Sequence, residues 1–248
     1  MHYKEFKIRI NKKIVNDLKK EILNARIIDW SPRNNKNAGL SFKDLKYVSD
    51  YWANKFDWKK QEKDLNKYKQ YKTKILNTDL HFLHIKSKKK NAIPLLLIHG
   101  WPGSFFEFLD LIPLLIGSKA ETKKHNLNFD LIIPSLPNVG YSFSKNQDPL
   151  DLQKIAKIFL QLMKQIGYKN YFIQGGDLGS FIASIMAVQN PKNVKGIHIN
   201  FLPLPRGLNK SPNNEDEKKF YFKLKKWMYY ETGYQQLQGT KPYTLAHA

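Results

Sequence analysis

Asp177 follows an apolar stretch and a pair of glycines, and Leu178 and Gly179 come directly after it. This order is the small-x-nucleophile-x-small pattern of a tight turn between a strand and a helix, with Asp where many enzymes carry Ser. Glycines suit such a turn because the backbone of the nucleophile is strained and both neighbouring elements approach it closely. A carboxylate in this position attacks carbon and forms an ester, so the sequence predicts that Asp177 is a nucleophile.

A second glycine-rich turn, His99-Gly100-Trp101-Pro102-Gly103-Ser104, directly follows an apolar run at residues 93–98. Strands of a parallel sheet end at the edge where ligands bind, so this turn and the Asp177 turn are predicted to lie side by side. In such an arrangement an oxyanion takes one backbone N–H from each turn. The expected oxyanion donors are the N–H groups of Trp101 and Leu178. Their order in the chain, each behind an apolar run, favours a catalytic site over two ordinary glycine turns.

The elements that must hold these turns are visible in the apolar pattern of residues 71–205. Short apolar runs typical of buried strands alternate there with segments of helical periodicity. This alternation implies βαβ units and therefore an α/β architecture, with a mostly parallel sheet and helices on both faces. The expected strands cover residues 79–85, 93–98, 129–133, 171–174 and 194–201, and the expected helices cover residues 105–116, 155–166 and 181–188.

The first 70 residues lack this alternation and are expected to form a helical N-terminal domain. Ile14, Leu18 and Ile22 recur every four residues behind a candidate cap at Asn11, which predicts a helix that ends before a polar linker at 32–39. Six aromatic side chains follow, and we expect them to pack against another layer in preference to forming a ligand cage. They are Phe42, Tyr47, Tyr51, Trp52, Phe56 and Trp58.

After residue 205 the chain becomes polar, with Lys, Asn and aromatic residues, and no strand pattern returns. The predicted organisation therefore has three parts. A helical domain covers residues 1–70, and a polar segment covers residues 206–248. Between them an α/β core of six strands, five of which are located above, covers residues 71–205.

The composition limits the class of partner. The 248 residues carry a formal net charge of +21, which would suit a nucleic-acid partner. Only four of the cationic residues are Arg, however, and the lysines are spread along the chain, so no nucleic-acid partner is expected. The chain has no Cys and shows no cluster of metal-ligand residues, so neither a metal nor a cofactor is expected.

The same composition bears on location. There is no apolar run of about 18 residues, so no membrane span is expected. The first residues are polar and lack the apolar centre of a signal peptide. The absence of Cys fits a reducing compartment, so a cytoplasmic location is expected. The sequence does not indicate an oligomeric state.

Three motifs together resemble those of the microsomal and juvenile-hormone types of epoxide hydrolase, which are α/β-hydrolases with a helical N-terminal domain. The motifs are His99-Gly100-Trp101-Pro102-Gly103-Ser104, Pro134-Ser135-Leu136-Pro137-Asn138-Val139-Gly140-Tyr141-Ser142 and Gly175-Gly176-Asp177-Leu178-Gly179. Residues 51–66 resemble the end of the family's N-terminal domain, and residues 200–205 and 231–242 also fit the family pattern. The resemblance covers essentially the whole chain. It implies that the N-terminal domain wraps round the core and that residues 206–248 are the start of the lid.

The resemblance implies that the protein opens an epoxide to a vicinal diol through a covalent glycol ester on Asp177. Tyr234 resembles the first of two lid tyrosines that donate a hydrogen bond to the epoxide oxygen. A phenol suits that role because the alkoxide formed on ring opening is a poor leaving group until it is protonated. Trp101 would act as an oxyanion donor and as a wall of the pocket. The implied partners are a small lipophilic epoxide and water.

Two departures from the family pattern leave the chemistry intact. Leu178 stands where the family usually has Trp, which removes a pocket wall and keeps the backbone N–H. It also argues against a haloalkane dehalogenase, in which an indole at that position would bind the leaving halide. Asn138 stands for a glycine, and Asn tolerates a left-handed backbone better than most residues do.

A third departure concerns the histidine that should activate water. The resemblance places this histidine and its acidic partner after Asp177, where the only histidines are His198, inside a predicted strand, and His247, next to the last residue. We therefore expect a C-terminally truncated enzyme that lacks the second lid tyrosine, the catalytic acid, the catalytic histidine and the last strands. Without a general base the ester would form and hydrolyse slowly. The alternative is a non-catalytic protein of the same fold that binds a lipophilic ligand.

Overall fold

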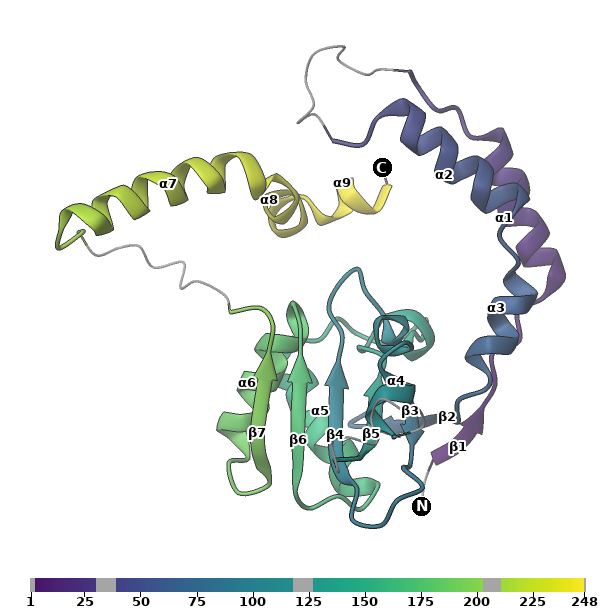
Figure 1. The fold of residues 1–248 in the computed structure, drawn as a ribbon. Coiled ribbons are helices and arrows are strands. Elements are labelled where there is room, and N and C mark those ends of the chain that lie inside the picture. Colours follow the sequence, from purple (N-terminus) through teal and green to yellow (C-terminus); the bar gives the residue numbers. More distant parts are fainter. Residues whose placement is uncertain (1–2, 30–38, 118–126, 203–210, 248) are drawn as a thin grey trace. The chain divides into compact units, whose positions relative to one another are not determined.

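The structure, a computed structural model, describes residues 3–29, 39–117, 127–202 and 211–247 (Figure 1). The chain divides into two compact units, Met1–Leu202 and Pro203–Ala248, each of which is described by itself. Most of the predicted linker at 32–39 lies outside the described residues, as does the predicted boundary between residues 205 and 206. The three-part division of the chain therefore stays a prediction.

The first unit is built on a seven-stranded sheet with the order β1-β2-β3-β5-β4-β6-β7 (Figure 1). Strands β5, β4, β6 and β7 run parallel to one another, and β1, β2 and β3 join the sheet antiparallel. The strands are β1 (Tyr3–Phe6), β2 (Gln70–Ile75), β3 (Thr78–Ile85), β4 (Ile93–Ile98), β5 (Phe129–Pro134), β6 (Tyr171–Gly175) and β7 (Val194–Ile199). The predicted α/β architecture is confirmed.

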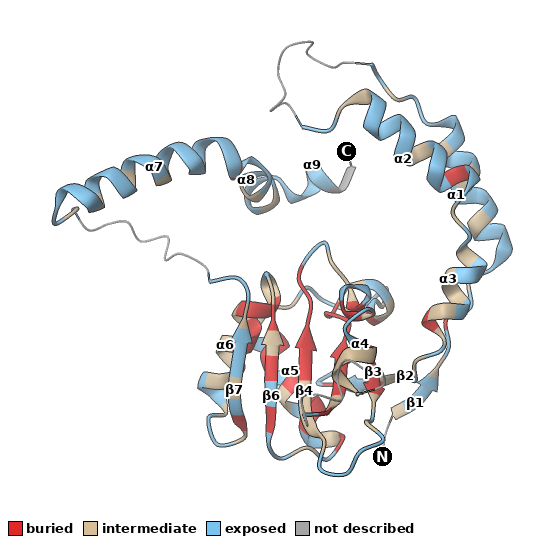
Figure 2. Ribbon diagram, viewed as in Figure 1, coloured by how far each residue is buried: buried red, intermediate tan, exposed pale blue. Residues whose placement is uncertain are grey.

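Helices cover both faces of this sheet because successive side chains of each strand point to opposite faces. Leu96 and Ile98 of β4 pack into a hydrophobic cluster with α5 (Leu152–Gln165) and α6 (Leu178–Gln189). Leu97, between them, belongs to a second cluster with the 3-10 helix η1 (Phe105–Phe108) and α4 (Ile112–Leu115). Figure 2 shows that the buried residues concentrate on the central strands, which therefore hold the turns at their carboxyl ends rigidly.

Most predicted core elements are confirmed, and one is wrong. The expected helix at 105–116 is in fact two short pieces, η1 and α4, with turn residues between them. Pro113 explains part of this break, because proline lacks the N–H that a continuous helix needs there and is tolerated in a first helical turn. The predicted left-handed backbone at Asn138 is confirmed by its φ of 64°.

The N-terminal residues form the expected helices and also an unexpected strand. Helix α1 (Lys12–Asn24) begins behind Asn11, whose side chain accepts the Lys13 N–H as predicted. Helices α2 (Phe42–Asn54) and α3 (Trp58–Leu65) follow. The expectation of a purely helical first 70 residues is wrong, because β1 pairs with β2 at the edge of the sheet.

Helix α3 is attached to the segment that follows β1 through three hydrogen bonds. The Asn66 side chain accepts the Ile8 N–H and donates to the Ile8 carbonyl, both at 2.9 Å. The Glu62 carboxylate accepts the Ile10 N–H at 2.8 Å, and this bond is the main reason that its pKa is lowered. Side chains here complete the backbone hydrogen bonds that β1 can no longer make beyond Phe6.

The second unit contains the helices α7 (Glu215–Glu231), α8 (Gly233–Thr240) and α9 (Pro242–His247). Asn214 caps α7 by accepting the Glu217 N–H, and the acidic side chains of the first turn suit the positive end of the helix dipole. Among its described residues this unit has helices and no strand, as the lack of a strand pattern after residue 205 predicts. Across the described parts of both units, no helix combines the length and apolar character needed to cross a membrane.

Candidate active site

Asp177 lies at the turn from β6 into α6 and has a strained backbone, with φ 50° and ψ −123°. This conformation is that of the first central residue of a type II′ turn, a position dominated by glycine. A non-glycine residue held there costs on the order of 1–3 kcal/mol, and such strain occurs mainly at functional sites. Close by, a Cβ on Gly179 would lie 2.2 Å from the Ile98 carbonyl oxygen, so only glycine at position 179 lets α6 start this close to β4.

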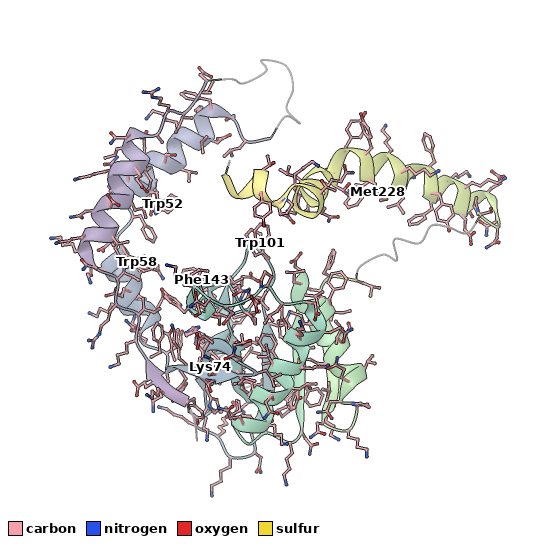
Figure 3. The ribbon with its side chains drawn as sticks, turned by 180° about the vertical axis from the view of Figure 1, so that it is seen from behind. Trp52, Trp58, Lys74, Trp101, Phe143 and Met228 are labelled. Atoms are coloured by element: carbon pink, nitrogen blue, oxygen red, sulfur yellow. The ribbon has the colours of Figure 1, made fainter. Side chains whose placement is uncertain are left out.

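The two glycine-rich turns lie side by side, as their positions after neighbouring strands predict. Ile98 of β4 pairs with Gly175 of β6, and the next residue, Gly176, donates its N–H to the Ile98 carbonyl at 3.4 Å. From this edge the Trp101 N–H reaches the Asp177 carboxylate and donates to Oδ1 at 3.0 Å. Figure 3 shows Trp101 on the loop beyond the carboxyl ends of the strands. The residue is 44% exposed.

Leu178, the other predicted donor, does not bond the carboxylate in this structure. Its N–H makes no hydrogen bond to Asp177 within the described part of the chain, and its side chain packs against the cluster beside α5 and α6. The Asp177 carboxylate is exposed, so a molecule can approach it. Of the two predicted donors, the structure therefore brings the Trp101 N–H into contact with the Asp177 carboxylate. Leu178 follows Asp177 in the chain without such a bond.

A second carboxylate near the nucleophile, that of Glu107, was missed in the sequence. Burial raises the pKa of Glu107, and the negative charge of Asp177 raises it further. The hydrogen bond that Glu107 accepts from the Ser104 N–H lowers the pKa in part. Ser104 caps η1 by accepting the Phe106 N–H, and Glu107 stands three residues after Ser104. This Ser-x-x-Glu spacing is the capping-box signature, which could have been found in the sequence.

The buried histidine His99 occupies the first position of the Trp101 turn. One ring nitrogen, Nδ1, lies 2.7 Å from the Gly100 carbonyl oxygen, and the other, Nε2, accepts the Leu136 N–H at 3.0 Å. Burial lowers the pKa of His99, so the ring is neutral at ordinary pH. No cluster of three or more His, Cys, Asp or Glu suited to a metal occurs among the residues that the structure describes.

Both parts of the chain match models of known protein families. Residues 3–108 match the family model described as epoxide hydrolase N terminus, and residues 93–243 match the family model described as alpha/beta hydrolase fold. Epoxide hydrolase 1 of Oryctolagus cuniculus is 34% identical over 263 residues, which cover 98% of this chain and 58% of the relative. The chain belongs to the epoxide hydrolase family of α/β-hydrolases.

Solved structures of epoxide hydrolases share the fold of this family member. The juvenile hormone epoxide hydrolase of Bombyx mori has a TM-score of 0.79 and 34% identity, with 98% of this chain and 58% of that chain covered. The epoxide hydrolase of Aspergillus niger has a TM-score of 0.83 and 29% identity, with 100% of this chain and 65% of that chain covered. This epoxide hydrolase family member spans somewhat more than half the length of the curated relatives it matches.

Tyr234, the predicted proton donor of this epoxide hydrolase family member, begins the first turn of α8 in the second unit. Its side chain is largely exposed within that unit, and its hydroxyl accepts a hydrogen bond from Gln235 Nε2 at 2.9 Å. Asp177 belongs to the first unit, so the role of Tyr234 beside it stays a prediction. His198 lies within β7 as predicted, paired with Gln174, and its side chain is exposed. The side chain of His247 lies outside the described residues.

Proposed function

We propose that Asp177 is the nucleophile of an epoxide hydrolase and opens an epoxide through a covalent ester. The observation that supports this most strongly is the hydrogen bond from the Trp101 N–H to Asp177 Oδ1 at the strained turn. The bond holds one carboxylate oxygen and leaves Oδ2 to attack. A carboxylate held in this way is oriented toward one approach path, which is how positioning lowers the barrier of a displacement.

In the proposed first step, Asp177 Oδ2 forms a bond to a ring carbon while the bond from that carbon to the epoxide oxygen breaks. The oxygen leaves as an alkoxide and takes a proton from the hydroxyl of Tyr234. The product is a hydroxyalkyl ester whose carbonyl oxygen is Oδ1, the atom that already accepts the Trp101 N–H. Trp101 and Leu178 are the proposed donors to this oxygen when water adds to the ester carbon.

In the second step water attacks the ester carbon, the ester bond to the alkyl oxygen breaks, and the diol is released. This step needs a base that takes a proton from the water. His99 is the histidine of the adjacent turn, but it cannot be this base because both of its ring nitrogens are already hydrogen-bonded. Within the described part of the chain no histidine is hydrogen-bonded to Asp177, so we expect the ester to last long enough to be detected.

The test is the intact mass of the protein after incubation with a simple aryl epoxide such as styrene oxide. We expect the mass to rise by that of one epoxide, with fragmentation placing the addition on Asp177. The matched control is Asp177→Asn, which keeps the size and backbone of the residue and should show no addition there. A protein that gives neither an ester nor a diol would overturn the proposal.

One observation favours a second candidate function, the binding of a lipophilic ligand without catalysis. A cavity of about 230 Å³ lies between α1 and the aromatic residues Trp52 and Phe56, with Tyr141 also lining it. The expected packing of the N-terminal aromatics is wrong for Tyr47, Tyr51 and Trp52, which are exposed. The volume lies below the roughly 300–1,000 Å³ of ordinary ligand sites, so catalysis remains the better-supported function.

The second function has its own test. Binding of an unreactive terpenoid, followed by tryptophan fluorescence, should be the same in the parent chain and in Asp177→Asn if this function is correct. A chain that fails to bind the terpenoid at all would remove it.

A further inference from the structure

The side chain of His99 is a hydrogen-bond bridge whose direction is fixed by its partners. The ring is fully buried, at 0% exposure. The Leu136 N–H needs a lone pair on Nε2, so Nε2 carries no proton. The proton of the neutral ring must then be on Nδ1, which donates it to the Gly100 carbonyl oxygen at 2.7 Å. His99 therefore holds the Gly100 carbonyl on one side and the backbone of Leu136 on the other.

The Gly100 carbonyl and the Trp101 N–H belong to the same planar peptide unit. The bond between them is trans, since the cis bond of this turn is the next one, Trp101–Pro102. In a trans peptide the C=O and N–H point in opposite directions, so fixing the direction of one fixes the direction of the other. The imidazole holds the C=O end of this unit, and the N–H end points at Asp177 Oδ1.

We infer that His99 is a positioning residue, which sets the orientation of the peptide whose N–H group binds the nucleophile. The inference deepens the proposed function and rests on it for the catalytic consequence, while the orientation itself can be measured without catalysis. Leu136 lies in the turn after β5, so the bridge ties the oxyanion donor to a third strand end.

A purely structural role for a buried histidine would look different, and His81 supplies the comparison. His81 is also fully buried, and its ring nitrogens contact the side chains of Ser135 and Gln70, at 2.9 Å each. These contacts join strands and do not involve the peptide at the nucleophile. His99 instead donates to the carbonyl of the donor peptide, and no other hydrogen bond to that carbonyl is present in the described part of the chain.

The peptide is also confined from the opposite side. A Cβ on Gly100 would lie 2.4 Å from the Asp177 Cβ, so the peptide is in close contact with the nucleophile's own side chain. The unit is therefore held between the imidazole and Asp177, and the bond from His99 is the part of this restraint that a substitution can remove without adding bulk.

Two substitutions separate the two bonds of the ring. His99→Asn places an amide N–H near the position of Nδ1, so it keeps the donor to Gly100 and loses the acceptor for Leu136. His99→Gln places an amide oxygen near the position of Nε2, so it keeps the acceptor and loses the donor. Both variants lose one buried bond, and urea unfolding would show how far each of them is destabilised.

The direct readout is the NMR signal of the Trp101 backbone amide in protein labelled with ¹⁵N-tryptophan. The chain has five tryptophans, so the spectrum is simple. Asp177→Asn assigns the Trp101 signal, because that substitution changes its acceptor. We expect the exchange of this amide with water to be about tenfold faster in His99→Gln than in His99→Asn, as the loss of one bond to a charged acceptor predicts. Equal exchange in the two variants would overturn the inference.

The catalytic readout is the rate of ester formation with styrene oxide. We expect His99→Gln to react about tenfold more slowly than His99→Asn when both are fully folded, because the carboxylate is no longer held in one orientation. Equal rates in the two folded variants, or a faster Gln variant, would also overturn the inference. If the parent chain forms no ester, the proposed function fails, and the amide exchange alone then decides the role of His99.

Discussion

The Trp101 N–H donates a hydrogen bond to Asp177 Oδ1 at 3.0 Å, so the proposed oxyanion donor contacts the nucleophile itself. The oxygen that it binds is the one that would become the ester carbonyl. The donor therefore need not move between the resting carboxylate, the ester and the oxyanion that water would generate from it. A donor that is already in place requires no reorganisation at the moment of reaction, which is the physical basis of electrostatic catalysis.

The strained backbone at Asp177 should be measurable as stability. We expect Asp177→Gly to be more stable than Asp177→Ala by about 1 kcal/mol, since only glycine adopts this conformation without strain. At an ordinary position the order is the reverse, because glycine gains more freedom on unfolding. Urea unfolding of the two variants checks the difference, and an alanine variant as stable as the glycine variant would contradict it. Neither should form the ester.

The glycine beside the nucleophile should not tolerate a methyl group. In Gly100→Ala the new Cβ would lie 2.4 Å from the Asp177 Cβ, so either the turn or the nucleophile must move. We expect ester formation to slow by about 100-fold, the cost of a displacement near 1 Å. Gly239→Ala, in α8, is the control because nothing lies within 4 Å of its added Cβ. Intact-mass kinetics on both variants decide, and equal rates would contradict the prediction.

The proposed proton donor can be tested by removing one oxygen atom. We expect Tyr234→Phe to slow ester formation by about 100-fold, the low end of what a positioned acid contributes. Tyr243→Phe is the matched control, because Tyr243 is also an exposed tyrosine of the second unit, at 82% exposure against 60% for Tyr234. If both variants react as fast as the parent chain, Tyr234 is not the proton donor.

The buried histidines should make the fold sensitive to acid. Burial lowers the pKa of His81 from 6.5 to about 3, and the nearby Lys72 charge adds to this. The folded protein therefore keeps His81 neutral while the unfolded chain protonates it. This contribution to stability is complete above pH 6.5 and is lost as the pH falls from there toward 3. The pKa values of His84 and His99 are lowered for the same main reason, so their effects have the same sign.

The measurement is the free energy of unfolding in urea at several pH values between 7 and 4. Below pH 6.5 one such histidine contributes a slope of up to about 1.4 kcal/mol per pH unit. In His81→Gln this part of the slope should disappear, whatever the stability of the variant at neutral pH. Parallel pH profiles for the parent chain and His81→Gln would show that His81 is not held neutral by the fold.

The sequence predicts the central strands well because their burial leaves a simple pattern. Strand β4 is continuously apolar, as expected for a parallel strand covered on both faces. The edge strand β1 and its neighbour β2 escaped prediction. In β2, Lys72 and Lys74 interrupt the apolar pattern. Lys72 instead lies over the ring of Phe6, with Nζ 4.6 Å from its centre. This contact between the two strands is invisible before their pairing is known.

The contacts of the site also divide into those that the sequence predicts and those that it does not. The proximity of Trp101 to Asp177 follows from the sequence because both turns succeed apolar runs that become neighbouring parallel strands. Glu107 could have been found through its spacing from Ser104. The bond between His99 and Leu136 could not, because it depends on the path of the loop after β5. Pairings that join separate loops are set by tertiary structure, and local patterns do not encode them.

The hydrogen bonds between Asn66 and Ile8 have a consequence for the evolution and engineering of the chain. They bring the two ends of residues 11–65 together at one edge of the sheet, so this stretch is in topological terms an insertion between two paired strands. Insertions with adjacent ends can be exchanged with little effect on the host domain. The part of this stretch before α3 can therefore vary in length or be replaced by another module. Helix α3 must stay, because Glu62 bonds the Ile10 N–H and Leu65 belongs to the core.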